Sequence, residues 1–429
     1  MGAEVVNQDG NSVTLQVTIN LDGETLLDVE EEILEACNDI GRKATALALQ
    51  RYDADGSPIE VNSKKLTSRT QSNKTYQTPF GEVNVKRHVY QSSSGGRIFV
   101  PLEQRARIIN QATPRFAKIL SNKYARMNAQ ECCSDMLENH GRKVTLSYLQ
   151  NISQAVSAFA QAQEEPWSYD LPTDLGNIET IVMSMDGAML LTWEDGYREA
   201  MVASISLYDE LGDRKHSIYF GASPEYGKSA FKNKFDQEAR RIKSAYPSAT
   251  YLGIADGAKD NWPILIKYVH HELIDFYHAT EYLSKVSHAA YPQKTGKPNR
   301  KKWMDEYCHI LKHEQDGALK ILEELKRVKR KHRLSKEQRE NTLSAISYFT
   351  NNHPRMNYAK HLENSWPLGS GVTEAACKTL IKQRFGRSGM RWKETGIKTV
   401  LSLRELVLTS GRWSQLWNKI TGGDFETSI

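Results

Sequence analysis

The sequence predicts an α/β fold, in which a mixed sheet carries an inserted helical subdomain and is preceded by a small β region and a helical unit. Two apolar runs, Ile181 to Leu190 and Tyr251 to Gly257, each deliver an aspartate followed by glycine, a pattern typical of buried strands that end at the rim of a sheet. The stretch from about Thr295 to Lys360 is helical in composition, whereas Lys74 to Val100 alternates with period two. These three observations indicate a sheet, a helical insertion and a separate antiparallel region.

The length of 429 residues is too great for one ordinary core and suggests two or three domains. We expect an acidic helix and a small antiparallel β region in 1–110, a helical domain in 111–163, a linker in 164–177, the first part of the α/β core in 178–290, a helical insertion in 291–365, and the last part of the core with a basic C-terminal helix in 366–429.

The composition argues against a disulfide-rich protein, a zinc ribbon and a membrane protein. A net charge of +5 and a pI near 8.7 are modest, so a polyanionic partner would be held by local basic patches. The five cysteines form no Cys-x-x-Cys pair, which favours neither a zinc ribbon nor a disulfide framework and is typical of a reducing compartment. No apolar stretch approaches the roughly 20 residues that span a bilayer, and Met1 to Leu21 lacks the pattern of a signal peptide. We expect a cytoplasmic protein that does not enter a membrane.

The N-terminal region should begin with an acidic helix, Leu26 to Leu49. Its carboxylates lie next to apolar residues in the sequence, which predicts a solvated face over a packed stripe; an intermolecular or autoinhibitory helix is the alternative. In the period-two region that follows, Gly81 and the Gly95-Gly96 pair mark turns of a small antiparallel sheet, which we expect to be free of metal.

Three helical segments follow one another between Thr113 and Gln163. Gly141 ends the second and Thr145 is a good N-cap for the third, so the last two have the spacing of a helix-turn-helix. Helix 146–160 is then a candidate reader of DNA, because Asn and Gln can bond an adenine edge in the major groove. A helix pair with an ordinary polar outer face is the alternative. The side chains expected to face the core are Leu146, Leu149, Ile152 and Val156, and those expected to face outward toward DNA are Ser147, Tyr148, Gln150, Asn151 and Gln154.

The α/β core should begin near Ile178, after a linker rich in Pro, acidic and turn-forming residues. The order of its elements is three antiparallel strands, a helix, and then alternating strand and helix. This order places Asp186 and Asp256 on neighbouring central strands. Beyond the two apolar runs, the elements that we expect are strands at Gly196 to Leu207 and Lys215 to Ala222, a helix at Lys228 to Tyr246, a helix from Asn261, and a short strand in HELIDFYH.

A third acid, Glu374, lies in GSGVTEAACKTLIKQRFG, where Ser370 and Gly371 indicate a helix start and place Glu374 in the first turn. Two strand-end aspartates and one helix glutamate form an oxygen-rich set suited to two Mg²⁺ ions about 4 Å apart, for in-line attack on a phosphodiester. Glu374 as a first-turn acid that interacts with the helix dipole, or as the partner of Lys378 in a surface pair, is the plainer explanation.

The motifs SMDGAML, IADGAKDNW, DFYHATEYL and WPLGSGVTEAACKTLIKQRFGRSGMRW, with ATPRFAKILSNKYA upstream, resemble the DDE transposases of bacterial insertion sequences, in particular the ISKra group, which is akin to the Mutator-like lineage. The resemblance covers most of the chain, and the GSGVTEAACK block is its most specific part. It implies an RNase H-like catalytic domain in which Asp186, Asp256 and Glu374 are catalytic and bind two Mg²⁺ ions, with Mn²⁺ as a substitute.

Asp275 and His278 stand in DFYH, after a predicted strand. The spacing is compatible with an ordinary capped helix start. It is also similar to the Asp/Cys-x-x-His signature of Mutator-like transposases, and that likeness implies that His278 is a catalytic contact to the scissile phosphate, supported by Asp275.

The interval of about 117 residues between Asp256 and Glu374 is too long for the last helix of a minimal core, which is why we expect an insertion. Its run KRVKRKHR, from Lys326 to Arg333, carries six fixed positive charges in eight residues. A solvated helix face is the default explanation; a track for the DNA backbone, with Lys329, Arg330 and Lys331 as contacts, is its rival. Trp303 and Trp366 could stack on a displaced base, although a place in the core is the stronger expectation for both.

The final helical stretch repeats Glu374, Lys378 and Lys382 at intervals of four, so we expect them on one stripe. The basic residues that follow suit a segment lying along a duplex backbone. The DNA contacts predicted here are Lys378, Lys382, Arg384, Arg387 and Arg391. Thr399 to Trp417 is predicted to be one packed closing helix.

Together these patterns lead us to expect a nucleoid-associated transposase that binds the terminal inverted repeats of an insertion sequence, cleaves with metal-activated water and joins the 3′-hydroxyl to target DNA. Its partner would be double-stranded DNA, with a homodimer in the synaptic complex. An RNase H-like structure-selective nuclease would share the acids without strand transfer. A domesticated DNA-binding protein would bind ends without catalysis.

Overall fold

The computed structural model describes residues 2–162, 168–225, 228–291, 297–331 and 334–422. The chain forms two compact units, one of Met1–Tyr169 with Arg412–Ile429 and the other of Asp170–Gly411. The division after Tyr169 falls within the stretch that we expected to be a linker. Most of that stretch beyond Ser168 is neither helix nor strand, and residues 163–167 lie outside the described residues.

The first unit contains a two-stranded hairpin, β1 (Gly2–Asp9) and β2 (Ser12–Thr18), which sequence reasoning did not predict, and the expected acidic helix α1 (Leu26–Gln50). Its antiparallel sheet runs in the order β3 (Ile59–Val61), β4 (Lys64–Thr78), β5 (Gly81–Ser92), β6 (Gly95–Phe99). The sheet therefore starts well before Lys74, because the polar first half of β4 alternates too weakly to be recognised as a strand.

The predicted three-helix region is confirmed as α3 (Pro114–Arg126), α4 (Ala129–His140) and α5 (Leu146–Ala162), after a short α2 (Pro101–Arg105). Gly141 ends α4 in the left-handed conformation, at φ 59°. Thr145 begins α5, since its hydroxyl accepts a hydrogen bond from the backbone N–H of Tyr148 at 3.3 Å. The turn between the two helices is thus fixed by the two residues that the sequence singled out.

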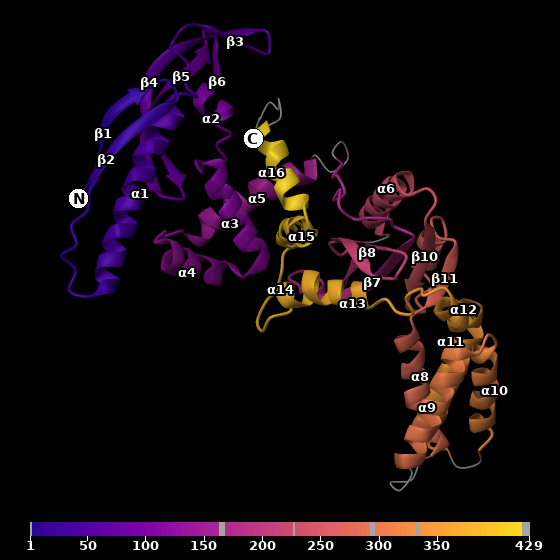
Figure 1. Ribbon diagram of the computed structural model, residues 1–429. Coiled ribbons are helices and arrows are strands. Elements are labelled where there is room, and N and C mark those ends of the chain that lie inside the picture. Colours follow the sequence, from indigo (N-terminus) through magenta and orange to yellow (C-terminus); the bar gives the residue numbers. More distant parts are fainter. Residues whose placement is uncertain (1, 163–167, 226–227, 292–296, 332–333, 423–429) are drawn as a thin grey trace. The chain divides into compact units, whose positions relative to one another are not determined.

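The second unit is built on a five-stranded mixed sheet in the order β11-β10-β7-β8-β9 (Figure 1). The strands are β7 (Thr180–Thr192), β8 (Gly196–Tyr208), β9 (Arg214–Ala222), β10 (Thr250–Ala255) and β11 (His271–Ile274). β7, β8 and β9 are antiparallel neighbours, whereas β10 is parallel to both β7 and β11. The expected order of strands is confirmed, with the strand of Asp256 beside the strand of Asp186.

Helix α6 (Ser229–Ala245) packs Phe231 and Phe235 against Phe220 of β9. The helix expected from Asn261 is the short α7 (Trp262–Leu265). The helical region then comprises α8 (Phe276–Ala290), α9 (Lys297–His313), α10 (Gly317–Lys329), α11 (Lys336–Asn352) and α12 (Tyr358–Glu363).

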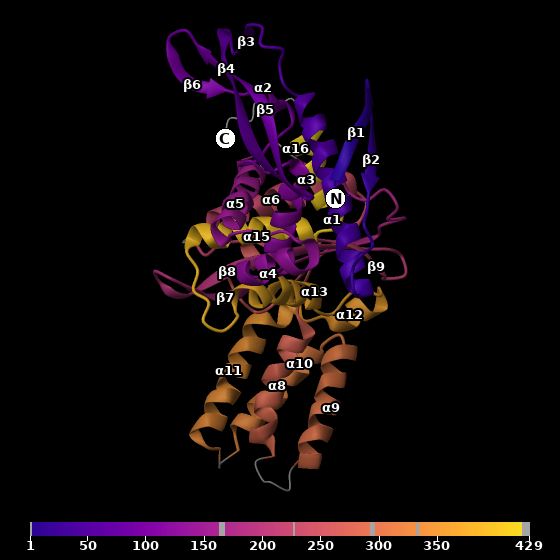
Figure 2. The same cartoon turned by 90° about the vertical axis from the view of Figure 1, so that its left-hand side faces the viewer.

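Figures 1 and 2 show α8, α9, α10 and α11 side by side as a bundle. The bundle begins with α8, which leaves the sheet directly from β11. It shares its buried residues with α11 and with the sheet, in one continuous core. The sheet and the bundle consequently form a single body.

After the bundle come α13 (Gly371–Ala376), a π-helical segment η4 (Cys377–Lys382), α14 (Gln383–Phe385), α15 (Glu394–Leu408) and α16 (Arg412–Gly422). The single closing helix that we expected at 399–417 is in fact two, separated at Gly411, whose φ is 83°. α16 belongs to the first unit, so the predicted last domain of 366–429 is divided between the two units.

In the part of the chain that the structure describes, no helix combines the length and the apolar character needed to cross a membrane.

Candidate active site

Asp186 lies within β7 and not at its end, contrary to the prediction. β7 pairs with β8 along its whole length, with Asp186 opposite Val202. On its other side β7 pairs with β10 only as far as Met183, opposite Gly253. Asp186 is therefore on a central strand, just past the point where the pairing of β7 with β10 ends, and β8 still pairs with it there.

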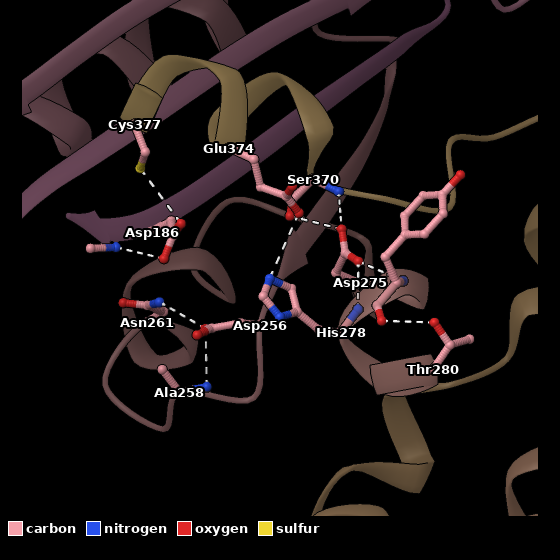
Figure 3. Close-up of polar contacts among 12 residues, drawn as sticks. Asp186, Asp256, Ala258, Asn261, Asp275, His278, Thr280, Ser370, Glu374 and Cys377 are labelled. Carbon is pink, nitrogen blue, oxygen red and sulfur yellow. Dashed lines mark hydrogen bonds and ion pairs between the residues drawn. The ribbon is translucent and has the colours of Figure 1, made fainter. Parts of the chain in front are cut away.

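Asp256 follows directly after β10. Its Oδ1 accepts hydrogen bonds from the backbone N–H of Ala258 at 3.1 Å and from Nδ2 of Asn261 at 3.3 Å (Figure 3). These bonds fix the carboxylate to the turn before α7. The expectation that Asp186 and Asp256 belong to neighbouring strands agrees with the pairing of β7 and β10.

Glu374 lies in the first turn of α13, as predicted. Its Oε1 is 3.7 Å from Nε2 of His278, on the first turn of α8 (Figure 3). The side chains are 47% and 36% exposed, so both can be reached from solvent. Three separate parts of the fold thus contribute the acids, and His278 lies beside the third.

Asp275 connects the helices that carry His278 and Glu374. The side chain is fully buried and is the N-cap of α8, where Oδ1 accepts from the backbone N–H groups of Tyr277 at 2.7 Å and His278 at 3.1 Å. Oδ2 accepts from the backbone N–H of Ser370 and from its hydroxyl, the latter at 2.8 Å. Ser370 is the N-cap residue of α13, so one carboxylate sets the start of both helices. Asp275 supports His278 by accepting a hydrogen bond from its backbone N–H. The capped helix start, which was one of the two explanations of this motif, is therefore present.

The carboxylates influence one another's ionisation. Burial raises the pKa of Asp186; a hydrogen bond from the N–H of Gly187 at 2.7 Å opposes this, and the charge of Asp256 raises the pKa further. Burial also raises the pKa of Glu374, followed by the charges of Asp275 and, more weakly, Asp186, while His278 lowers it. Burial is therefore the main reason that both carboxyls hold their protons more tightly, and the neighbouring negative charges add to it.

Cys377 is a site residue that sequence reasoning missed. Its Sγ lies 3.5 Å from Oδ2 of Asp186, and burial strongly raises the pKa of the thiol, so the neutral S–H donates to the carboxylate. The sequence did contain a signal for Cys377: it comes one turn after Glu374 and so lies on the same side of a helix whose start was predicted.

Among the described residues, no three His, Cys, Asp or Glu side chains are gathered closely enough to hold one metal ion. Glu374 is turned toward His278. The acids nevertheless supply carboxylate oxygens, the ligands that Mg²⁺ and Mn²⁺ take in proteins.

The outward face predicted for α5 is present in part. Gln150, Asn151 and Gln154 are exposed. Tyr148, in contrast, has a buried hydroxyl, and burial raises the pKa of that group, so its predicted contact with DNA is wrong. Leu146 is exposed rather than in the core, because it stands in the first turn, beyond the apolar stripe of Leu149, Ile152 and Val156.

In the bundle, Lys329 and Arg330 are exposed at the end of α10. Lys331 is exposed too, but its Nζ donates to the carbonyl of Ala290 at 2.8 Å and so fastens α10 to α8. The last two residues of the basic run, 332 and 333, lie outside the described residues. Trp303 is buried against Tyr307 as a core aromatic, and Trp366 is half-buried, 4.8 Å from His271 between ring centroids.

The C-terminal basic residues begin on a segment that changes to a π-helix at Cys377. Lys378 and Lys382 are exposed on it, as Glu374 is one turn earlier. Arg404, which is buried, donates to the carbonyls of Leu380, at 3.1 Å, and Thr379 in this segment.

Arg384 was predicted to contact DNA, and this is wrong. The side chain is only 1% exposed, and its guanidinium carbon lies 4.9 Å above the ring of Trp392. Arg387 and Arg391 are exposed and stay available as candidates.

No protein-family model matches the chain, and no curated protein matches it.

Proposed function

We propose that the chain is a DDE transposase with an RNase H-like catalytic domain. The order of the sheet supports this proposal, since three antiparallel strands are followed by parallel strands β10 and β11 on the side of β7. In that arrangement the first and fourth strands are adjacent, so the strand that carries Asp186 lies beside the strand that ends just before Asp256. The sequence motifs that resemble the insertion-sequence transposases contain the same acids.

The observation that carries the proposal is the placement of the three acids: Asp186 on a central strand, Asp256 directly after the parallel strand beside it, and Glu374 one turn before Cys377, whose thiol contacts Asp186. Their residues lie far apart in the chain, yet the charge of Asp256 raises the pKa of Asp186 and the charge of Asp186 raises that of Glu374. Keeping like charges together costs free energy, and a fold retains such a group where a cation or a reaction needs it.

The donor set fits Mg²⁺ by its chemistry. Asp186, Asp256 and Glu374 would hold the ions, and Glu374 would exchange its contact with His278 for the metal. Bound there, two Mg²⁺ ions would activate the attacking water and stabilise the leaving oxygen of the phosphodiester.

The remaining residues orient this set. Cys377 and the N–H of Gly187 each bond one oxygen of Asp186 and fix the carboxylate plane. Asp275 holds the starts of α8 and α13 together, so the positions of His278 and Glu374 depend on each other. His278 would then be free to donate a hydrogen bond to a phosphate oxygen on which charge develops.

A strand-transfer assay tests the proposal against its rivals. The protein would be incubated with Mg²⁺, a duplex carrying the element's terminal inverted repeats and a supercoiled target plasmid. Joined products with 3′-ends in the target support the transposase. Hydrolysis without joining would indicate a nuclease, and binding without metal-dependent cleavage would indicate a DNA-binding protein.

A further inference from the structure

A cavity of about 590 Å³ lies in the first unit, whereas the proposed active site belongs to the second. It is lined by β4, β5 and β6, by helix α2 and by the turn at Asn110 and Gln111; the strands and α2 lie together in Figure 2. Its volume is within the roughly 300 to 1,000 Å³ of small-ligand sites. The proposed function uses none of the residues that line it.

Three cations and one carboxylate line this cavity: Lys74, Arg87, Arg97 and Glu103. Lys74 and Arg87 come from the same face of neighbouring strands, because Lys74 lies opposite Val85, two residues before Arg87. The ammonium of Lys74 is half-buried and makes no hydrogen bond or ion pair with the residues that the structure describes. Three positive charges and one negative leave the lining with a net charge of +2, which favours an anion.

Arg87 is the most confined of these cations. Its side chain is 9% exposed, and Nη2 pairs with Oε1 of Glu103 at 3.5 Å. The same Oε1 also accepts a hydrogen bond from the hydroxyl of Tyr76 at 2.9 Å, so this carboxylate is shared. Nε and Nη1 of Arg87 are buried without a hydrogen-bond partner in the described parts of the chain. A buried guanidinium that is paired so incompletely is costly unless a further anion compensates its charge.

The rest of the lining supplies an apolar wall and amide groups. The side chains of Gln104 and Gln111 provide amides that make no hydrogen bond with the described residues. A phosphate monoester matches both halves of the lining, since its head group carries nearly two negative charges at neutral pH and its organic part can pack on apolar side chains. The apolar residues are Val61, Ile98, Phe99, Val100, Ile108 and Ile109.

We propose that this cavity binds a phosphate monoester. The phosphate lies against Lys74 and Arg87, and the organic group packs on Ile98 and Phe99. A carboxylate or a phosphodiester carries a single negative charge and would neutralise only half of the net charge of the lining. Two sources can supply a phosphate monoester, a small metabolite and the 5′-phosphorylated end of a nucleic-acid strand. The inference does not depend on the function proposed above.

Isothermal titration calorimetry on the full chain tests this inference, at about pH 8, where a phosphate monoester is a dianion. The probe is phenyl phosphate, compared with phenyl sulfate, which has nearly the same shape and one negative charge. Wild type should bind phenyl phosphate with a Kd of about 1 mM or lower, the scale of two or three charge-assisted hydrogen bonds. Phenyl sulfate should bind at least about tenfold more weakly, because it lacks the second charge.

Three variants locate the effect. Lys74→Gln removes a cation that has no partner to lose, and it should weaken binding of phenyl phosphate about tenfold with an unchanged melting temperature. Arg87→Met should abolish detectable binding; if this variant does not fold, because Arg87 also pairs with Glu103, Lys74→Gln decides. Lys86→Gln removes the same charge from an exposed position on the other face of β5, outside the lining, and should bind as wild type.

The inference is overturned if wild type does not bind phenyl phosphate, if phenyl sulfate binds equally well, or if Lys74→Gln and Lys86→Gln lose the same affinity. Competition with duplex DNA separates the sources of the ligand. A duplex with 5′-hydroxyl ends that displaces phenyl phosphate would assign the cations to the DNA backbone and overturn the inference as well. Displacement only by a 5′-phosphorylated duplex identifies a strand end as the ligand, and displacement by neither identifies a small metabolite. None of these outcomes depends on cleavage activity.

Discussion

At the scale of single residues, each proposed metal-binding aspartate is followed by a glycine for a reason of space. A Cβ at Gly187 would be 2.2 Å from Oε1 of Glu199, and one at Gly257 would be 2.4 Å from Tyr348. Neither glycine has a positive φ. The sequence pattern predicted the two acids and indicated that the glycines after them form turns. In the structure these glycines instead leave space for the side chains of Glu199 and Tyr348. A local pattern cannot show this, because both side chains come from other parts of the chain.

Asp275→Asn should destabilise the second unit. The amide leaves one acceptor oxygen in place of two for four donors in a fully buried position, and a hydrogen bond to a charged group is worth about 1.5 to 3 kcal/mol. We expect a loss of at least about 2 kcal/mol in the free energy of unfolding, measured by denaturant titration. Unchanged stability would contradict the role of Asp275 in joining α8 and α13.

His278→Ala should leave folding and DNA binding nearly intact, since the side chain is 36% exposed. Cleavage at saturating Mg²⁺ should fall by about 100-fold to 1,000-fold, the usual effect of losing one preorganised donor. His288→Ala, at an exposed position on the same helix, is the control and should cleave as wild type. Normal cleavage by the His278 variant would mean that this residue has only a structural role, in the first turn of α8.

His361 gives a prediction on pH and stability. The ring is buried, Nδ1 lies 3.0 Å from the carbonyl of Pro367, and burial lowers the pKa of His361 from 6.5 to about 4. Below pH 6.5 the unfolded chain takes up a proton that the folded ring refuses, so the free energy of unfolding falls as pH drops through that window. The full effect is about 3 kcal/mol. Denaturant titrations across this range should show a weaker slope for His361→Gln, and an equal slope would contradict the assignment.

At the scale of elements, the pair of helices α4 and α5 was predictable because local signals fix it: Gly141 and Thr145 mark the turn between them. The π-helical segment after Glu374 was not predictable from local signals, and its contact with Arg404 comes from α15, more than twenty residues further along the chain. For the same reason Arg384 appeared to be a DNA contact in a basic run, although Trp392, eight positions later, covers it.

We expect α5 to determine the specific binding of the element's ends and α10 to contribute to binding of any DNA duplex. Gln150→Ala with Asn151→Ala on α5 should weaken binding to the element's ends, by about 1 to 3 kcal/mol for each base that the helix no longer reads, and leave binding to random duplex unchanged. Lys329→Ala with Arg330→Ala on α10 should weaken both equally and reduce the salt dependence of binding. An equal reduction in affinity for both duplexes in the α5 variant would remove the helix-turn-helix from the account of end recognition.

At the scale of the whole molecule, the mixed sheet and its strand order could be predicted, because strand alternation and turn residues are local and the βα connections restrict the topology. The division of the chain into units could not. α16 joins the N-terminal unit through contacts such as that of Arg412, whose guanidinium carbon lies 5.2 Å from the ring of Tyr169. No pattern within residues 412–422 indicates so distant a partner.

The central claim is that Asp186, Asp256 and Glu374 act as one metal-binding set. Its most direct test is Mg²⁺-dependent cleavage of duplex carrying the element's ends by Asp186→Asn, Asp256→Asn and Glu374→Gln, with end binding measured in parallel. Glu281→Gln serves as the matched control, because Glu281 is an exposed acid on α8 whose charge contributes to the raised pKa of Glu374. Each of the three variants should bind ends and fail to cleave, while the control cleaves normally. Cleavage near the wild-type rate by any one of the three would contradict the claim.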